Sequence, residues 1–353
     1  MEIQAKIELI TMFAAGVAAS VLLLGPTIRL AFRIGLVDKP DKLRKFHGKS
    51  TAYMGGAILW VGVMGGLLAE GMLRGTTEMM PVAISCSILF LTGIVDDAHD
   101  LRPWLKLVFQ FLSVGILVWS IPAWHPASGS ADLAGLCILV VLGVGIVNAF
   151  NLIDGLDGLA LGIGILSTTP FFLRGWMDSD HLQVAFALAF LAAATGLLKG
   201  NLHPAKIFLG DAGSLQVGCI VFAFALQGQA APGDGNLSRI GELAPLLVGI
   251  PFVDMVVVMR SRIGRGVPVF QGERTHIHHR LLKAGHSHES TVGILHAATG
   301  VLSLFEAVLV VAGIPLVWTL LALPLWIPVY RLASQQNPVT NATTNEGAIS
   351  HAH

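Results

Sequence analysis

Two asparagines and two aspartates recur at three-residue intervals inside an apolar run. They are Asn148, Asn151, Asp154 and Asp157 in NAFNLIDGLDGLA. Residues three apart are neighbours on a helix surface, so the first three predict a polar stripe on the last turns of one helix, with Gly155 as the break. A carboxylate at mid-bilayer costs at least about 2.5 kcal/mol, so the aspartates are expected at a helix end or in a wet cavity. Alternatively, Asp157 caps the next helix and the asparagines bridge helices.

A second cluster, VDDAHD, carries adjacent carboxylates and another one helical turn later. Asp96, Asp97 and Asp100 form this DDxxD pattern. A helix cap would use one aspartate, and three like charges repel one another unless a cation lies nearby. Carboxylate oxygens are hard ligands that suit a divalent metal bound to a diphosphate. Lys106 follows closely, and its ammonium group can act as a point charge on phosphate.

The motif FLGDAGS places Asp211 between two glycines, just before an apolar helix expected from about Ser214. One interpretation is that Asp211 caps this helix. The other is a phosphate site, because glycines let the backbone approach a phosphate and a helix N-terminus attracts anions.

The motif HIHHR gathers imidazole groups in an arginine-rich segment. No cysteine or spaced acidic ligand completes a zinc set there, so the motif favours phosphate binding or proton handling. A basic loop that only orients the protein in a membrane is the alternative. The motif comprises His276, His278, His279 and Arg280, whereas His286, His288 and His296 are given no role.

The composition indicates which kind of fold positions these polar groups. Of the 353 residues, 54% are hydrophobic and only 12% are charged, which predicts an all-α, polytopic membrane protein. Apolar runs long enough to span about 30 Å of hydrocarbon recur along the chain. The first is expected to be a retained helix. The eleven expected transmembrane helices cover residues 7–30, 54–73, 80–95, 105–121, 133–153, 158–173, 182–199, 212–228, 241–259, 292–312 and 315–330.

The basic residues indicate an orientation. If the helices alternate in direction, one face receives every polar cluster and carries 17 of the 22 Lys and Arg, which predicts that this face is cytoplasmic. The active site is therefore expected on the cytoplasmic face of a single catalytic domain, residues 1–331. Residues 332–353 are polar without periodicity and are expected to form a disordered tail.

A face with many carboxylates, two asparagines and a histidine-rich loop suits Mg²⁺-dependent chemistry on a diphosphate, with the helices holding an apolar partner. At these clusters the sequence resembles the polyprenyl-phosphate N-acetylhexosamine-1-phosphate transferases, and most of all the bacterial undecaprenyl-phosphate N-acetylglucosamine-1-phosphate transferases. The likeness spans about residues 35–283, through DKP…RKFH…GG, DDAHDLRPWLK, NAFNLIDGLDGL, FLGDAGS, GIPFVD…R and PVFQGERTHIHHRLL. HIHHRL favours this branch over the muramyl-pentapeptide branch.

The resemblance implies attack by undecaprenyl phosphate on the β-phosphate of a UDP-N-acetylhexosamine in the bacterial cytoplasmic membrane, with release of UMP. It implies Mg²⁺, or Mn²⁺, as cofactor, bound by Asn151 and Asp211. Asp96 or Asp97 would act as base toward the lipid phosphate or position it, and Lys106 would contact the diphosphate. The substrate-binding residues would be Arg44, Lys45, His47, Asp154, Asp157, Phe208, His276, His278, His279 and Arg280.

Two other functions compete with this interpretation. A membrane prenyltransferase also uses aspartate-rich motifs with Mg²⁺, but it gives HIHHR no task. A transporter should show internal repeats and a polar site near mid-membrane, whereas here the polar residues gather at one face. No nucleic acid partner is expected, a homodimer is left open, and the motifs do not fix the sugar or the downstream polymer, such as O-antigen or teichoic acid.

Overall fold

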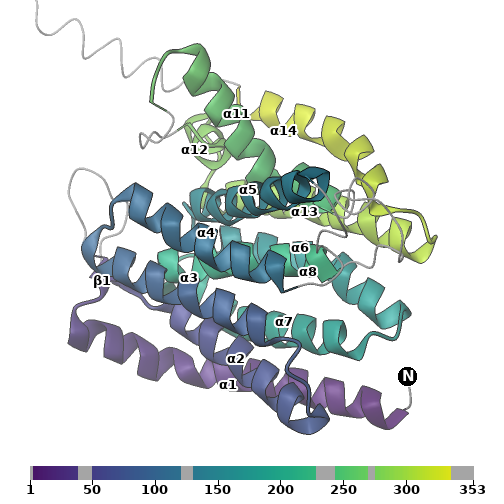
Figure 1. The fold of residues 1–353 in the computed structure, drawn as a ribbon. Coiled ribbons are helices and arrows are strands. Elements are labelled where there is room, and N and C mark those ends of the chain that lie inside the picture. Colours follow the sequence, from purple (N-terminus) through teal and green to yellow (C-terminus); the bar gives the residue numbers. More distant parts are fainter. Residues whose placement is uncertain (1–2, 39–49, 121–129, 228–242, 269–274, 335–353) are drawn as a thin grey trace, which may run out of the picture.

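The computed structural model describes residues 3–38, 50–120, 130–227, 243–268 and 275–334, which fold as a bundle of helices lying alongside one another (Figure 1). Proline in the first turn starts several of these helices, as at Pro103, because the missing N–H needs no partner there. The helices are α1 (Ile3–Ile34), α2 (Gly55–Arg74), α3 (Met80–His99), α4 (Pro103–Trp119), α5 (Ser130–Ile153), α6 (Leu159–Met177), α7 (His181–Asn201), α8 (Gly210–Gln227), α10 (Ala244–Val248), α11 (Ile250–Gly264), α12 (Ile277–Lys283), α13 (His288–Val311), the 3₁₀ helix η3 (Leu316–Leu325) and α14 (Trp326–Leu332).

Helix α8 is the centre of the bundle. Nearly all of its residues are buried, and it packs against α2, α3, α5 and α6. On one side, α7 joins the bundle through small residues, since Gly62 and Gly66 of α2 lie directly against Ala193 and Ala189. Small residues let helix backbones approach closely, which is how helices associate in a membrane. Because four helices pack around α8, its first turn is held on several sides.

Among the described residues, six helices are long and apolar enough to cross a membrane. Their outer surfaces carry exposed apolar side chains such as Leu22 and Leu68, which suits contact with lipid. Two further apolar helices, Pro103–Trp119 and Val317–Leu332, are shorter. The chain is thus a multi-pass membrane protein, and the full set of eleven crossings stays a prediction. The six candidate spans are Ile7–Ile34, Gly55–Met72, Met80–His99, Leu133–Ile153, His181–Asn201 and His288–Val311.

Two expected helices are broken. Residues 241–259 divide at Gly249, where α10 ends and α11 begins. Pro251 in the first turn of α11 has no N–H for the carbonyl four residues earlier, which favours a break at this point. Residues 315–330 divide into η3 and α14, and η3 contains Pro324. Proline removes a helix donor there as well, which explains why a hydropathy run predicted one helix and the structure has two.

A small sheet is the exception to the expected all-α fold. Strand β1 (Val37–Asp38) pairs antiparallel with β2 (Thr51–Tyr53), and β2 pairs parallel with β3 (Ile207–Phe208). Strands of two or three residues give no periodicity that a sequence pattern could reveal. The register sets Tyr53 beside Phe208 and ties the start of α2 to the start of α8.

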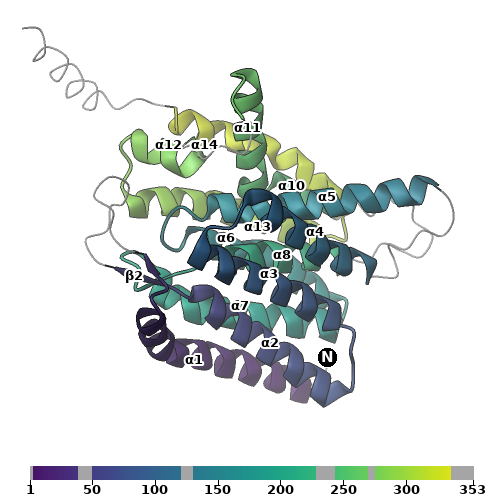
Figure 2. The same cartoon turned by 60° about the vertical axis from the view of Figure 1, so that its left-hand side comes forward.

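The sheet lies at the end of the bundle where α3, α5 and α7 finish and α4, α6 and α8 begin (Figure 2). The connections from α3 to α4, from α5 to α6 and from α7 to α8 therefore face the same end. This arrangement brings together polar motifs that are far apart in the sequence.

Candidate active site

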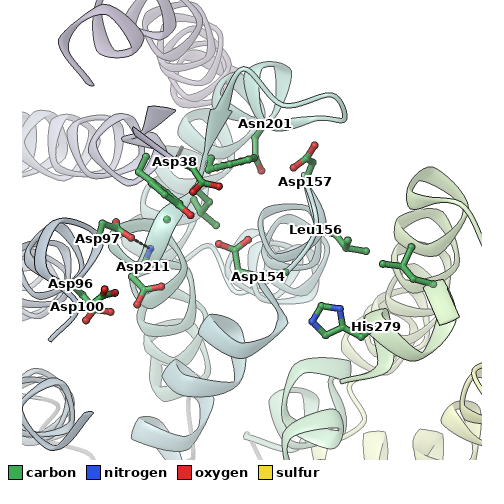
Figure 3. Close-up of a pocket in the computed structure, with 16 residues that line it drawn as sticks. Asp38, Asp96, Asp97, Asp100, Asp154, Leu156, Asp157, Asn201, Asp211 and His279 are labelled. Atoms are coloured by element: carbon green, nitrogen blue, oxygen red, sulfur yellow. Dashed lines mark hydrogen bonds between the residues drawn. The ribbon is translucent and has the colours of Figure 1, made fainter. Parts of the chain in front are cut away.

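A cavity of about 550 Å³ opens at this end of the bundle (Figure 3). Seven aspartates line it, and no lysine or arginine of the described part of the chain is among the lining residues. So many carboxylates repel one another unless cations neutralise them. The lining residues are Asp38, Tyr53, Asp96, Asp97, Asp100, Asp154, Gly155, Leu156, Asp157, Asn201, Phe208, Leu209, Gly210, Asp211, His279 and Leu282.

The ammonium group of Lys106 lies behind this wall and joins three helices. Its Nζ donates to Asp96 Oδ2 at 2.9 Å, to Asn151 Oδ1 at 3.2 Å and to Asp211 Oδ2. Asp96 Oδ1 in turn accepts the backbone N–H of Leu101 at 2.8 Å. Three oxygen acceptors from α3, α5 and α8 thus converge on one positive charge.

The asparagines of the polar stripe have different partners. Asn151 Nδ2 donates to Asp211 Oδ1 at 2.8 Å and to Ser214 Oγ at 2.9 Å, so it faces the first turn of α8. Asn148 exchanges hydrogen bonds with Gln110 of α4, at 2.6 and 3.2 Å. Asn148 therefore bridges two helices, as in the alternative interpretation, whereas Asn151 contacts Lys106 and Asp211 beside the cavity.

Asp97 holds the N-terminus of α8. Its Oδ1 accepts the backbone N–H of Asp211 at 2.9 Å, and its Oδ2 accepts that of Ala212 at 3.2 Å. The helix begins at Gly210 rather than near Ser214, so Asp211 is not its cap. Gly210 has a φ of 70°, and a side chain there would press on the Asp97 carboxylate.

The segment between α5 and α6 carries Asp154 and Asp157. The break predicted at Gly155 is confirmed, because α5 ends at Ile153. Asp154 points into the cavity (Figure 3), where burial, followed by the charges of Asp211 and the other aspartates, raises its pKa well above the ordinary value. Burial and the neighbouring charges thus both disfavour the ionised form of this carboxyl group.

Asp157 does not cap α6, contrary to the alternative interpretation, since the N-cap is Gly158 without a side-chain bond. Asp157 Oδ2 instead contacts His203 Nδ1 at 2.8 Å and accepts the backbone N–H of Ala205 at 3.0 Å. Asn201 closes the same corner, because it accepts the N–H of Gly158 at 3.1 Å and donates to the carbonyl of Ile207 at 3.0 Å.

An aromatic pair forms another part of the wall. The rings of Tyr53 and Phe208 lie 5.6 Å apart on the paired strands β2 and β3. Burial, followed by the charges of Asp97 and Asp211, raises the pKa of the Tyr53 hydroxyl to about 12, so it stays a neutral donor. The rings are tilted by 53° to each other, and the face of a single aromatic ring beside polar groups can stack on a nucleobase.

The side chains of the HIHHR motif lie in different environments. His279 lines the cavity. His276 is buried and contacts Asp254 of α11, with its Nδ1 2.7 Å from Oδ2. Arg280 lies over the ring of Tyr330, 5.4 Å from its centroid. His276 and Arg280, which were expected to bind substrate, thus lie outside the lining of the cavity.

His278 is buried against Gly155, and neither ring nitrogen has a hydrogen-bond partner in the described part of the chain. Burial, followed by the neighbouring histidines, lowers its pKa well below the ordinary value. His278 is therefore a neutral packing group beneath the Asp154 segment and does not line the cavity.

The sequence analysis missed some of the cavity. Asp38, Tyr53 and Asn201 line it without having been chosen, although Asp38 begins the quoted DKP motif. Asp254 was quoted in GIPFVD without a role, and it accepts the Ile277 N–H at 2.9 Å as well as holding His276. Three chosen residues, Arg44, Lys45 and His47, lie outside the described residues.

The oxygens around Lys106 are of the kind that bind a divalent cation. Asp96, Asn151 and Asp211 supply only carboxylate and amide oxygens, and all three already surround one cationic group. Mg²⁺ prefers such oxygen ligands together with substrate phosphates. The residues present therefore fit Mg²⁺, and the same oxygens also suit Mn²⁺.

Comparison with known proteins agrees with this geometry. A family model described as glycosyl transferase family 4 matches residues 79–229, which include the polar motifs of α3, α5 and α8. The chain belongs to this family of membrane transferases.

Three relatives illustrate the likeness. A Bacillus subtilis protein named "Probable undecaprenyl-phosphate N-acetylglucosaminyl 1-phosphate transferase" is 32% identical over 302 residues, 82% of each chain. The decaprenyl-phosphate N-acetylglucosaminephosphotransferase of Mycobacterium tuberculosis is 31% identical over 79% of this chain and 77% of its own. The undecaprenyl-phosphate alpha-N-acetylglucosaminyl 1-phosphate transferase of Escherichia coli is 27% identical over 78% and 77%. The resemblance inferred from the motifs is thus confirmed.

Proposed function

We propose that this protein transfers N-acetylhexosamine-1-phosphate, in the first place GlcNAc-1-phosphate, from a UDP-sugar to undecaprenyl phosphate. The products are undecaprenyl-diphospho-sugar and UMP. The observation that carries the proposal is the Lys106 ammonium held by Asp96, Asn151 and Asp211 at the wall of an acidic cavity. Such a constellation suits a diphosphate that arrives with its own metal ion, and the names of the relatives support this substrate class.

The reaction balances without an added co-reactant. An oxygen of the lipid phosphate attacks the β-phosphorus, which carries the sugar, and the bond from this phosphorus to the bridging oxygen breaks. The bridging oxygen leaves with UMP. A phosphate monoester has a second pKa near 6, so the attacking group is already a dianion in most molecules at neutral pH. A dedicated general base is therefore not required.

Asp96 and Asp97 act in this proposal as positioning residues. Asp96 holds Lys106, and Asp97 holds the N-terminus of α8 together with Asp211. Lys106 can then turn from its carboxylate partners toward the diphosphate as a point charge. Before substrate binds, its hydrogen bonds to three helices hold that charge beside the cavity wall.

Asn151 and Asp211 would hold Mg²⁺, with Mn²⁺ as an alternative. When bound, the ion supplies neutralisation of the diphosphate charge and orientation of its oxygens. Burial, followed by the charges of neighbouring carboxylates, raises the pKa of Asp154. A cation bound nearby would favour the ionised form of this group.

Phe208 and Tyr53 provide the surface for uracil, with Asp157 at the edge of the same wall. His279, from α12, closes the opposite side (Figure 3) and can donate to the sugar phosphate. The lipid tail stays in the bilayer beside the helices. We place this end of the bundle in the cytoplasm, at the inner membrane of a bacterium, because UDP-sugars are made there and the basic residues gather at this end. The reaction would begin the synthesis of a cell-surface polysaccharide, such as O-antigen or teichoic acid.

The test uses purified protein in detergent with radiolabelled UDP-GlcNAc and undecaprenyl phosphate. We expect label in the lipid fraction and one UMP for each labelled lipid, and neither when the lipid phosphate is omitted. A parallel panel with UDP-GalNAc and 6-deoxy donors identifies the sugar. Consumption of a prenyl diphosphate instead, without UMP release, would make the protein a prenyltransferase and overturn the proposal.

A further inference from the structure

Three potential metal ligands meet beside the cavity, and none of them is needed for the oxygen site at Lys106. Asp157, His203 and His288 each offer one ligand atom, and these atoms lie within 4.8 Å of one another. They come from three parts of the chain: the segment between α5 and α6, the segment after α7, and the first turn of α13. The fold therefore assembles this group from residues that no single motif contains.

The two imidazole rings face each other. His203 and His288 are stacked with their centroids 4.0 Å apart. His203 Nδ1 lies 2.8 Å from Asp157 Oδ2, and His203 Nε2 lies 3.6 Å from Glu289 Oε1. Glu289 is largely exposed, so its carboxylate can move inward without breaking the core. A second carboxylate is thus within reach of the histidine pair.

Two imidazoles with one or two carboxylates suit a late first-row metal better than Mg²⁺. Zn²⁺ binds histidine nitrogen and carboxylate oxygen at about 2.0–2.2 Å in a tetrahedral arrangement, which sets neighbouring ligands about 3.3 Å apart. Ligand atoms within 4.8 Å need only small side-chain rotations to reach this spacing. The oxygen donors around Lys106, by contrast, contain no imidazole.

The backbone around the group keeps it in place. Asp157 is buried and is fixed by the N–H of Ala205 at 3.0 Å. Ser287 caps α13 through the N–H of Ser290 at 3.1 Å, which sets the direction in which His288 leaves the helix. His203 is the more exposed member, so an ion can enter from the aqueous side. The site is therefore preorganised, because Asp157 is buried and His288 begins a capped helix. It is also accessible, because His203 is exposed.

We propose that Asp157, His203 and His288 bind a zinc-type divalent ion at the rim of the cavity. This site is separate from the one that Asn151 and Asp211 provide for Mg²⁺. It shares Asp157 with the cavity wall, so the ion lies next to the nucleotide side of the pocket.

The experiment measures Zn²⁺ binding to the full-length protein, purified in detergent with a tag that contains no histidine. Excess Mg²⁺ keeps the oxygen ligands occupied, and a chromogenic chelator competes for Zn²⁺. We expect His203→Gln and His288→Gln each to weaken one Zn²⁺ site at least about 100-fold, because loss of even an outer partner of a metal ligand costs about 10–100-fold. His286→Gln is the matched control, two residues from His288, and should bind like wild type.

A second measurement uses only the wild-type protein, so misfolding of a variant cannot affect it. The zinc X-ray absorption spectrum of the one-to-one complex should show two imidazole nitrogens together with oxygen ligands. Equal Zn²⁺ affinity in wild type, His203→Gln and His288→Gln would overturn the proposal. So would an equal loss in His286→Gln, or a spectrum without two imidazoles.

Discussion

The carboxylate of Asp97 receives the backbone N–H of Asp211 at 2.9 Å, across a sequence separation of 114 residues. It also receives the N–H of Ala212, so the side chain caps a helix from another part of the chain. Its neighbour Asp96 instead holds Lys106. Two adjacent carboxylates thus have separate tasks, one for the helix and one for the ammonium group.

Asp97→Ala should lower stability more than Asp96→Ala. Loss of a helix cap costs about 0.5–2 kcal/mol, and Asp97→Asn, which keeps one acceptor oxygen, should lie between the alanine variant and wild type. Thermal unfolding in detergent, followed by intrinsic fluorescence, measures the difference. Equal unfolding temperatures for Asp97→Ala and wild type would contradict the capping role.

Lys106→Gln should reduce UMP release by about 10²–10³-fold, the usual cost of removing one well-placed charge-stabilising donor. Lys106→Arg should recover part of the rate because the charge remains. Lys199→Gln is the control, since Lys199 is an exposed lysine on the last turn of α7. Rates in Lys106→Gln that match those of the control would remove the ammonium from the reaction.

Asn151→Ala and Asp211→Asn should each lose nearly all activity and require more Mg²⁺ for what remains. Both residues offer oxygens beside Lys106, and Asn151 also orients Asp211 through a 2.8 Å hydrogen bond. In wild type, EDTA should abolish UMP release, and added Mg²⁺ or Mn²⁺ should restore it. Activity that persists in EDTA would show that the reaction needs no metal.

His279→Ala should lower the rate of UMP release by about 10²-fold at unchanged protein level, because this histidine lines the cavity and can donate to the phosphates. His286→Ala, from the following turn, serves as the control and should leave the rate unchanged. Equal losses in the two variants would mean that the HIHHR segment acts only through folding.

His278 predicts a pH dependence of stability. Its pKa is lowered in the folded protein, so the unfolded chain takes up the proton first, and stability falls as the pH drops below the ordinary pKa of about 6.5. Replacement by a group that does not titrate, as in His278→Leu, should make the unfolding temperature less sensitive to pH between about 6.5 and 5. Parallel curves for the two proteins would contradict this assignment.

Much of the site could be predicted because its residues belong to local patterns. Asn151 and Asp154 lie three residues apart near a helix end, and Asp96 belongs to DDxxD, so each motif is visible by itself. The contacts that no motif could reveal depend on distant partners. Asp157 binds His203, 46 residues away, and His276 binds Asp254, 22 residues away.

In the fold, too, local features could be predicted and long-range contacts could not. Hydropathy located the long helices, because a membrane-spanning run is a property of consecutive residues. It did not predict the break at Gly249 or the three short strands, since these depend on proline chemistry and on pairing across the chain. His288 received no role for the same reason, because only the folded chain brings it to His203.

The burial of α8 at the centre of the bundle has a consequence for biosynthesis. Lys106 meets Asp211 across 105 residues, and Asn151 meets it across 60. A nascent chain that has inserted α1 to α7 already carries Lys106 and Asn151, but it has no Asp211 with which to complete the constellation. On the proposed function, we therefore expect activity toward a nucleotide sugar only after α8 has been translated and packed between the helices that precede it.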